Sequence, residues 1–220
     1  HQDDTGTAYK MQYELLDINP PYERRYLLSD KDGKYYRIEH NKAFVDAITF
    51  NGYQCIRTGI IPNQDTKVKV TINTSSFGEY ALFGARTSME ADMFGLYLTS
   101  AAQVNGQYGT ESLIETVDDY TGIDVTFEIS KEGLKRDDVV IAEFAEVTFE
   151  APVEIVIGTC NTNGTLDSRY FKGNIIKIEV WQKEEQKLDL IPCVDEQLQV
   201  CFYDTLSETC FYNSGYGKLG

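Results

Sequence analysis

Basic residues, histidine and long apolar stretches are all scarce in this 220-residue sequence, and each scarcity excludes a class of function. Twenty Lys and Arg residues face 35 Asp and Glu residues, so the formal net charge is −15. Because binding to nucleic acid and to anionic membranes depends on clustered positive charge, neither partner is expected. No apolar run reaches the length of about 18 residues that a membrane-spanning helix requires, so membrane insertion is not expected.

The amino terminus lacks a basic segment followed by an apolar stretch, so the sequence predicts no secretion signal. The chain begins at His1 rather than Met and could be part of a longer protein. Hydrophobic residues make up 42% of the chain and charged residues 25%, which is typical of a globular protein with a packed core. At this length one main domain is expected.

Cysteine spacing gives no metal or disulfide motif. The five cysteines are an odd number without a CxxC pair, so reduced and mostly buried thiols are expected rather than a zinc site or a disulfide framework. These residues are Cys55, Cys160, Cys193, Cys201 and Cys210. A hairpin turning at 204–207 would place Cys201 opposite Cys210, which leaves one direct cross-strand disulfide open.

Only two histidines, His1 and His40, are available for catalysis. A Ser-His-Asp or Cys-His site therefore has almost nothing to draw on. The sequence also lacks a phosphate-binding loop and a dinucleotide-binding fingerprint. These absences argue against the common nucleophilic and nucleotide-dependent enzymes.

Alternation of apolar and polar residues dominates the pattern and predicts strands at 68–72, 123–129, 147–149, 153–157 and 176–181. The inward residues would be Ile123, Val125, Phe127 and Ile129 in the second of these strands, and Ile176, Ile178 and Val180 in the last. No apolar stripe with helical spacing extends over three turns. Residues 184–190 are polar and would form at most one loose turn.

The first 46 residues have a different pattern. Asn19, Pro20 and Pro21 form a stiff break before two short predicted strands, 26–28 and 35–38. The loop between these strands contains Asp30, Asp32 and Gly33, which is typical of a β-hairpin. We therefore divide the chain into an N-terminal connector with a β-hairpin at 1–46 and a main domain at 47–220.

Seven short motifs in the main domain share the order and spacing of a known family. They are 56–63 (IRTGIIPN), 82–86 (LFGAR), 94–97 (FGLY), 171–175 (FKGNI), 190–193 (LIPC), 201–204 (CFYD) and 211–215 (FYNSG). Together they resemble the concanavalin A-like, laminin-G-like jelly-roll domains of phage tail and fibre proteins and of gut-bacterial surface proteins. The resemblance implies an all-β, antiparallel two-sheet jelly-roll sandwich with a short N-terminal β connector.

Domains of this family often bind glycans or decorate a virion or cell surface. The resemblance therefore implies a non-catalytic recognition or decoration module of a phage particle, such as a tail fibre, receptor-binding or head-fibre component, that binds host surface glycan. Other virion proteins would be partners, and a homo-oligomer, trimeric in a fibre, is expected. Two alternatives stay open: a secreted or surface-attached bacterial carbohydrate-binding domain, and a purely structural virion protein.

Related sandwiches include glycoside hydrolases, in which paired carboxylates flank the bond that is cleaved. Glu146 and Glu150 have a spacing that would put them on one face of a strand, but Thr148 stands where the middle carboxylate would be. A solvated sheet face explains both glutamates. No catalytic residue is therefore predicted.

Side chains on the outer faces of the predicted strands form the first candidate site. Alternation at 80–86 would turn Ala81, Phe83 and Ala85 inward. Tyr80, Arg86, Tyr97 and Trp181 would then face outward. Aromatic rings can cover the CH face of a sugar, and an arginine can bind its hydroxyls or an acidic group. The simpler interpretation is that these rings only cover the sheet.

Loops supply the second set of candidates, because binding groups on a rigid β scaffold often lie in connections. The residues expected in loops are Asn105, Tyr108, Tyr120, Arg169 and Tyr170. All of them could equally be ordinary solvated positions.

Calcium is the only cofactor that the sequence suggests, and the signal is weak. Asp118 and Asp119 could help hold Ca²⁺ through their carboxylate oxygens. The segment 30–33 contains part of a calcium loop but lacks the distal glutamate, so a turn stabilised by aspartate is expected there.

Overall fold

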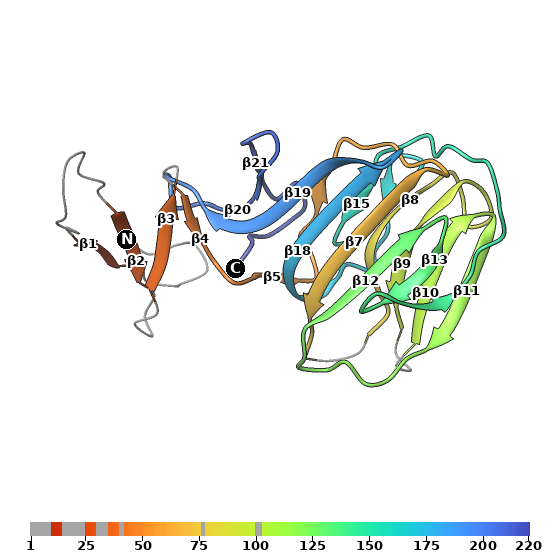
Figure 1. Cartoon of the computed structure of the whole chain (residues 1–220), viewed down its shortest axis with the longest axis horizontal. Helices are drawn as coiled ribbons and strands as arrows, with labels where there is room; N and C mark the ends of the chain where they lie inside the picture. Colours follow the sequence, from red (N-terminus) through yellow and green to blue (C-terminus); the bar gives the residue numbers. More distant parts are fainter. Residues whose placement is uncertain (1–9, 15–24, 30–34, 40–41, 76–77, 100–102) are drawn as a thin grey trace.

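The protein is described by a computed structural model that covers residues 10–14, 25–29, 35–39, 42–75, 78–99 and 103–220. The first three of these ranges are described as backbone strands only. The described residues form strands and turns without an α-helix, and the strands make two sheets that pack as a sandwich (Figure 1). The predicted all-β, antiparallel two-sheet fold is confirmed.

The first sheet runs from the connector across one layer of the sandwich. Its strands, in spatial order, are β1 (Lys10–Glu14), β2 (Arg25–Ser29), β3 (Tyr35–Glu39), β4 (Lys42–Phe44), β19 (Glu185–Val194), β18 (Lys172–Gln182), β7 (Thr66–Asn73), β12 (Val125–Ser130), β13 (Gly133–Arg136) and β14 (Val139–Ala142). Three further strands join it, with β5 (Ile48–Asn51) on β18, β20 (Val200–Asp204) on β19, and β21 (Cys210–Phe211) on β20.

The second sheet forms the other layer. Its strands, in spatial order, are β11 (Glu111–Thr116), β10 (Gln103–Gly109), β9 (Met93–Leu98), β8 (Tyr80–Arg86), β15 (Val156–Ile157) and β6 (Ile56–Arg57). Strand β16 (Cys160–Thr162) pairs with β8 and with β17 (Thr165–Leu166). The β16–β8 contact is parallel, whereas the other strand pairs of both sheets in the described chain are antiparallel.

The core lies between the two layers and follows the predicted alternation most closely in β7. Val68, Val70 and Ile72 of this strand are buried, and the residues between them are partly exposed. On the opposite layer, Phe83 and Phe94 belong to the same cluster. Burial of apolar surface between the layers provides the main favourable free energy for this fold.

A β-bulge shifts the inward face of β18 away from the predicted residues. In β18 the register shifts between Ile175 and Lys177, so Ile175 is buried in place of Ile176, while Ile178 and Val180 face the core as predicted. A bulge adds one residue and reverses the alternation on one side of it. Ile123 precedes β12 and is exposed rather than inward.

Three segments differ from their predicted secondary structure. Residues 147–149 form no strand, because the connection from β14 to β15 is irregular and places Phe144 and Phe149 in the core without a regular partner strand. Only Val156 and Ile157 of 153–157 form a strand. Within 184–190, where the sequence predicts at most one loose turn, residues 185–190 form the first part of β19, because pairing with β18 outweighs the weak strand propensity of their polar residues.

The predicted connector hairpin is present as β2 and β3, and β1 adds a strand that the sequence analysis missed. Strand β4 then pairs with the end of β19, so the connector continues the first sheet beyond the sandwich (Figure 1). The aspartates of the 30–33 loop and both histidines lie outside the described residues.

The predicted pairing of Cys201 with Cys210 is wrong. The chain does turn after β20, but the turn is wider than expected, and Cys210 lies opposite Tyr203 instead. Cys201 lies directly opposite Cys193 on β19. A difference of two residues in register is enough to change the partner of a strand residue.

The fold predicts a large stability loss from truncation of Phe171. Its ring is fully buried and packs against Phe50 and edge-on against Tyr80. We expect Phe171→Ala to lower the free energy of unfolding by about 3–5 kcal/mol through lost burial and a residual cavity. Denaturant unfolding would measure it. Tyr216→Ala, at a ring that is 81% exposed, should change stability by less than about 0.5 kcal/mol, and equal losses in both variants would contradict this core.

Candidate functional site

The candidate site lies on the outer face of the second sheet, opposite the core. Ala81, Tyr97 and Cys160 form a small buried cluster there, separate from the main core. Strand β8 has a bulge between Ala81 and Phe83, so Ala81 faces outward, contrary to the prediction, while Phe83 and Ala85 face the core. Gly84 leaves room for the Cys160 side chain, because a Cβ at position 84 would lie 2.8 Å from Cys160 Sγ.

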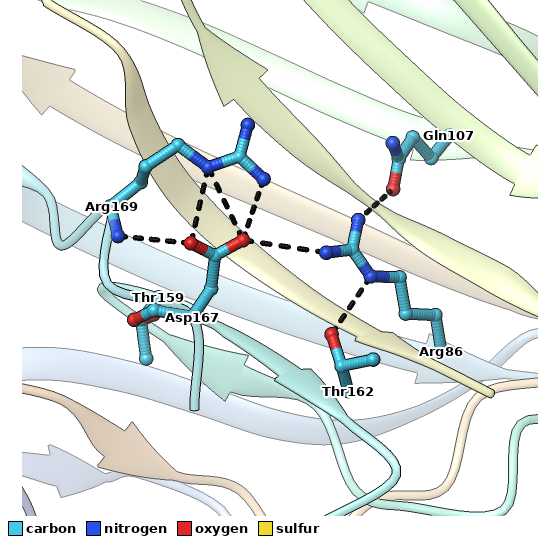
Figure 2. Close-up of polar contacts among 6 residues, drawn as sticks. All are labelled: Arg86, Gln107, Thr159, Thr162, Asp167 and Arg169. Carbon is cyan, nitrogen blue, oxygen red and sulfur yellow. Dashed lines mark hydrogen bonds and ion pairs between the residues drawn. The ribbon is translucent and has the colours of Figure 1, made fainter. Parts of the chain in front are cut away.

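Two arginines share one carboxylate at the centre of this face, as Figure 2 shows. Arg86 Nη2 donates to Asp167 Oδ2 at 3.3 Å, and Arg169 Nη2 donates to the same oxygen at 2.6 Å. Arg86 also donates from Nε to Thr162 Oγ1 at 2.8 Å and from Nη1 to Gln107 Oε1 at 3.4 Å. The Arg86 residue is only 3% exposed, so these contacts compensate for burial of its charge.

Asp167 is held in a fixed orientation by its neighbours. Its Oδ1 accepts hydrogen bonds from the Arg169 backbone N–H at 3.0 Å and from Arg169 Nε at 3.1 Å. The Thr159 hydroxyl donates to the Asp167 backbone carbonyl at 2.8 Å. Burial by itself would raise the pKa of Asp167, but hydrogen bonds from Arg169 and the charge of Arg86 outweigh it, so the pKa lies below its ordinary value.

Tyr97 faces outward as predicted but is covered by the arginines. Its residue is 4% exposed, and the guanidinium carbons of Arg169 and Arg86 lie 4.7 Å and 5.6 Å from its ring centroid. Burial raises the pKa of Tyr97, and its hydroxyl faces the Cys160 thiol. The ring therefore supports the arginines through cation–π contact and has no free face on which a sugar could stack.

A cavity of about 280 Å³ opens beside this network. It is lined by Glu79, Met89, Tyr97, Leu98, Thr99, Asn105, Gln107, Ser112 and Arg169. Amide, hydroxyl and guanidinium groups dominate the polar part of this lining, and Asn105 Oδ1 accepts a hydrogen bond of 2.9 Å from the Ser112 hydroxyl across β10 and β11. Arg86 and Asp167 contact two of the lining residues: Arg86 donates a hydrogen bond to Gln107, and Asp167 forms an ion pair with Arg169.

The structure brings together four of the seven predicted binding residues. Tyr97, Asn105 and Arg169 line the cavity. Arg86 donates a hydrogen bond to Gln107, which is another lining residue. Asn105 lies in strand β10 rather than in a loop, whereas Arg169 lies in the loop before β18 as predicted.

The other three predicted binding residues lie elsewhere. Tyr80 packs inward against the core because of the bulge in β8, and its ring meets Phe171 edge-on. Tyr108 is in strand β10, is buried in the core and donates its hydroxyl to the Gln64 carbonyl at 2.5 Å, and burial raises its pKa to about 12. Trp181 faces outward as predicted, but on the first sheet, where the Lys67 ammonium lies 4.1 Å from its ring centroid.

The remaining candidates have structural explanations. Tyr120 is fully buried against Phe127, and Tyr170 forms a single bridge to Ala81. Asp119 Oδ1 accepts the Thr121 backbone N–H at 2.8 Å, so this carboxylate stabilises a turn. Asp118 is exposed.

Glu146 and Glu150 are exposed in the irregular connection after β14, rather than on a sheet face as expected. Neither glutamate therefore lies on one of the strands of the described chain, and the two do not form the strand-borne carboxylate arrangement considered above.

The sequence analysis missed Asp167, Gln107 and Glu79. Gln107 could have been found by extending β10, because it shares the outward alternation of Asn105. Asp167 lies two residues before Arg169, a spacing that permits a local ion pair, but its contact with Arg86 spans 81 residues of sequence and has no local signal.

Comparisons with known proteins assign no family, because neither a family model nor a curated protein matches the chain. Within the described ranges, no helix is long and apolar enough to span a bilayer.

The network predicts that Asp167→Asn lowers the free energy of unfolding and makes it less dependent on pH in the acidic range. Removing this charge leaves Arg86 buried without its counter-ion, which should cost about 3 kcal/mol at neutral pH. Since the folded pKa of Asp167 is lowered, its stabilising contribution is present above the unfolded pKa and is lost as pH falls through the folded pKa. Denaturant unfolding from neutral to acidic pH would measure both effects.

Asp138→Asn is the matched control, because Asp138 forms an exposed ion pair with Lys69. We expect that variant to unfold almost as the parent does at neutral pH. If Asp138→Asn lost as much stability as Asp167→Asn, the buried pair of Arg86 and Asp167 would stabilise the protein no more than an exposed ion pair does.

Proposed function

We propose that this chain is a non-catalytic recognition module that binds a glycan in the cavity on the outer face of its second sheet. The observation that supports this proposal is the polar cavity itself, which is built on adjacent strands and fixed from behind by the Arg86 and Asp167 pair. Cavities that bind small ligands combine a pre-formed shape with a few oriented polar groups. This cavity has both properties.

The chemistry of the lining suits the hydroxyl groups of a sugar, which donate and accept hydrogen bonds at the same time. Asn105 and Gln107 carry amides that can do both, and Thr99 and Ser112 add hydroxyls. Because Tyr97 is covered, binding would depend on hydrogen bonds and on the apolar surface of Met89, rather than on aromatic stacking.

Charge at the cavity favours a neutral sugar. Arg86 and Arg169 contribute two positive charges, and Asp167 and Glu79 contribute two negative charges, so the local sum is zero. A strongly acidic glycan would also approach a chain of net charge −15. Electrostatic steering would therefore oppose its association.

The setting of this module is proposed from the sequence resemblance. We propose a phage particle, with other virion proteins as partners and with several copies of the chain arranged symmetrically. Single shallow sugar sites bind weakly, and repeated copies raise the overall affinity through effective concentration. A bacterial carbohydrate-binding domain would use the same cavity in another setting.

The test is binding of the full chain to an array of bacterial surface polysaccharides and oligosaccharides, followed by calorimetry on any ligand found. Asn105→Ala removes one amide from the cavity and should weaken binding about fivefold, equivalent to about 1 kcal/mol for one hydrogen bond. The matched control is Asn73→Ala, which removes an amide that donates to Asp124 at 2.8 Å outside the cavity. This control should bind as the parent does.

Three outcomes would overturn the proposal. Silence across the array would favour a purely structural surface protein. Equal weakening by Asn105→Ala and Asn73→Ala would place the ligand outside the cavity. Release of reducing ends from any polysaccharide would show that the chain is an enzyme.

A further inference from the structure

Three cysteines converge where the first sheet extends toward the connector. Cys193 lies on β19, Cys201 on β20 and Cys210 on β21 (Figure 1), and their Sγ atoms all lie within 4.8 Å of one another. The Cys193 and Cys201 sulfurs are 3.0 Å apart. The cluster is the only group of three or more potential metal-ligating Cys, His, Asp or Glu side chains at this spacing in the described part of the chain.

Strand register argues that Cys193 and Cys201 remain separate thiols. Pro192 turns its carbonyl toward β4, where it accepts the Val45 N–H at 3.1 Å, so the backbone groups of Cys193 point the other way, toward β20. Cys193 and Cys201 are therefore a hydrogen-bonded pair of the antiparallel ladder, with Cα atoms about 5.5 Å apart.

Cβ atoms are farther apart in such a pair than in a non-hydrogen-bonded one. A disulfide requires a Cβ separation of about 3.8 Å, so it would distort the ladder at this position. A zinc–thiolate bond of about 2.3 Å instead requires sulfur separations of about 3.8 Å in a tetrahedral site. Rotation of the side chains can provide that separation without moving the strands.

The surroundings of the cluster suit a soft metal ion. Phe44, Ile191 and Tyr203 pack against the thiols, and the Lys42 ammonium lies 4.5 Å from the Tyr203 ring centroid, where its charge favours nearby thiolates. A cavity of about 440 Å³ reaches Cys210 from solvent. It provides an entry path for an ion and room for a water molecule.

We propose that Cys193, Cys201 and Cys210 form a three-thiolate site for a zinc ion, with water from the adjoining cavity in the fourth position. Each thiol releases its proton to solvent as its sulfur binds the metal, and no electron is transferred. Three thiolates are soft ligands of the kind that zinc prefers. The ion would join β19, β20 and β21, and so fix the last hairpin beside β4.

The test uses the full chain purified with a phosphine reductant and titrated anaerobically with Zn²⁺, and with Co²⁺ as a spectroscopic substitute. We expect one equivalent of metal, a sulfur-to-cobalt charge-transfer band and a zinc-dependent rise in the melting temperature. Cys210→Ser should weaken zinc binding at least about 100-fold, since even indirect partners of a metal site contribute about 10–100-fold. Cys210 is the most accessible of the three, so this variant is the least disruptive to folding.

Cys55→Ser is the control, because Cys55 is a thiol outside the cluster, and it should bind zinc as the parent does. Unchanged zinc affinity in Cys210→Ser, with the parent circular dichroism spectrum retained, would overturn the proposal. Absence of the charge-transfer band would overturn it as well. Mass spectrometry of the reductant-treated protein would reveal a Cys193–Cys201 disulfide by the loss of two hydrogens. That result would also overturn the proposal, because the two cysteines would then form a disulfide instead of a zinc site.

Discussion

Packing of the two sheets through their apolar faces is the constraint on which the other features depend. Val70 of the first sheet and Phe94 of the second belong to one buried cluster. Since side chains alternate along a strand, a strand that gives one face to this core must turn the other face outward. Both the polar cavity and the thiol cluster lie on such outward faces. The core therefore determines which side chains face outward and can bind a ligand, although the core residues themselves do not contact it.

Strong alternation made the fold class, strand β7 and the outward positions of Arg86, Tyr97 and Trp181 predictable from sequence. Two of the failures occur where neighbouring residues are all apolar. Ile175 and Ile176 are adjacent, so nothing local says which of them a bulge will turn inward. Ala81 is likewise followed by two apolar residues, and the bulge there reversed the expected directions of Tyr80 and Ala81. Alternation predicts a face only while the ladder stays regular.

Long-range pairing explains the rest of what the sequence could not show. Asp167 meets Arg86 only because the loop after β17 returns to the outer face of β8. The thiols meet because the turn after β20 includes Glu208 in a left-handed conformation, with φ of 58°, and so sets the register of Cys210. Each contact depends on a loop geometry that composition does not specify.

Strand β19 relates these two outward sites to each other. Its first half pairs with β18 inside the sandwich, and its second half pairs with β4 and β20 beyond it. A metal ion that holds β19, β20 and β21 together would therefore fix the direction in which the connector leaves the body that carries the cavity. Such an ion would not contact the sugar. It would still affect binding by an assembly, because avidity requires that several cavities reach one surface at the same time.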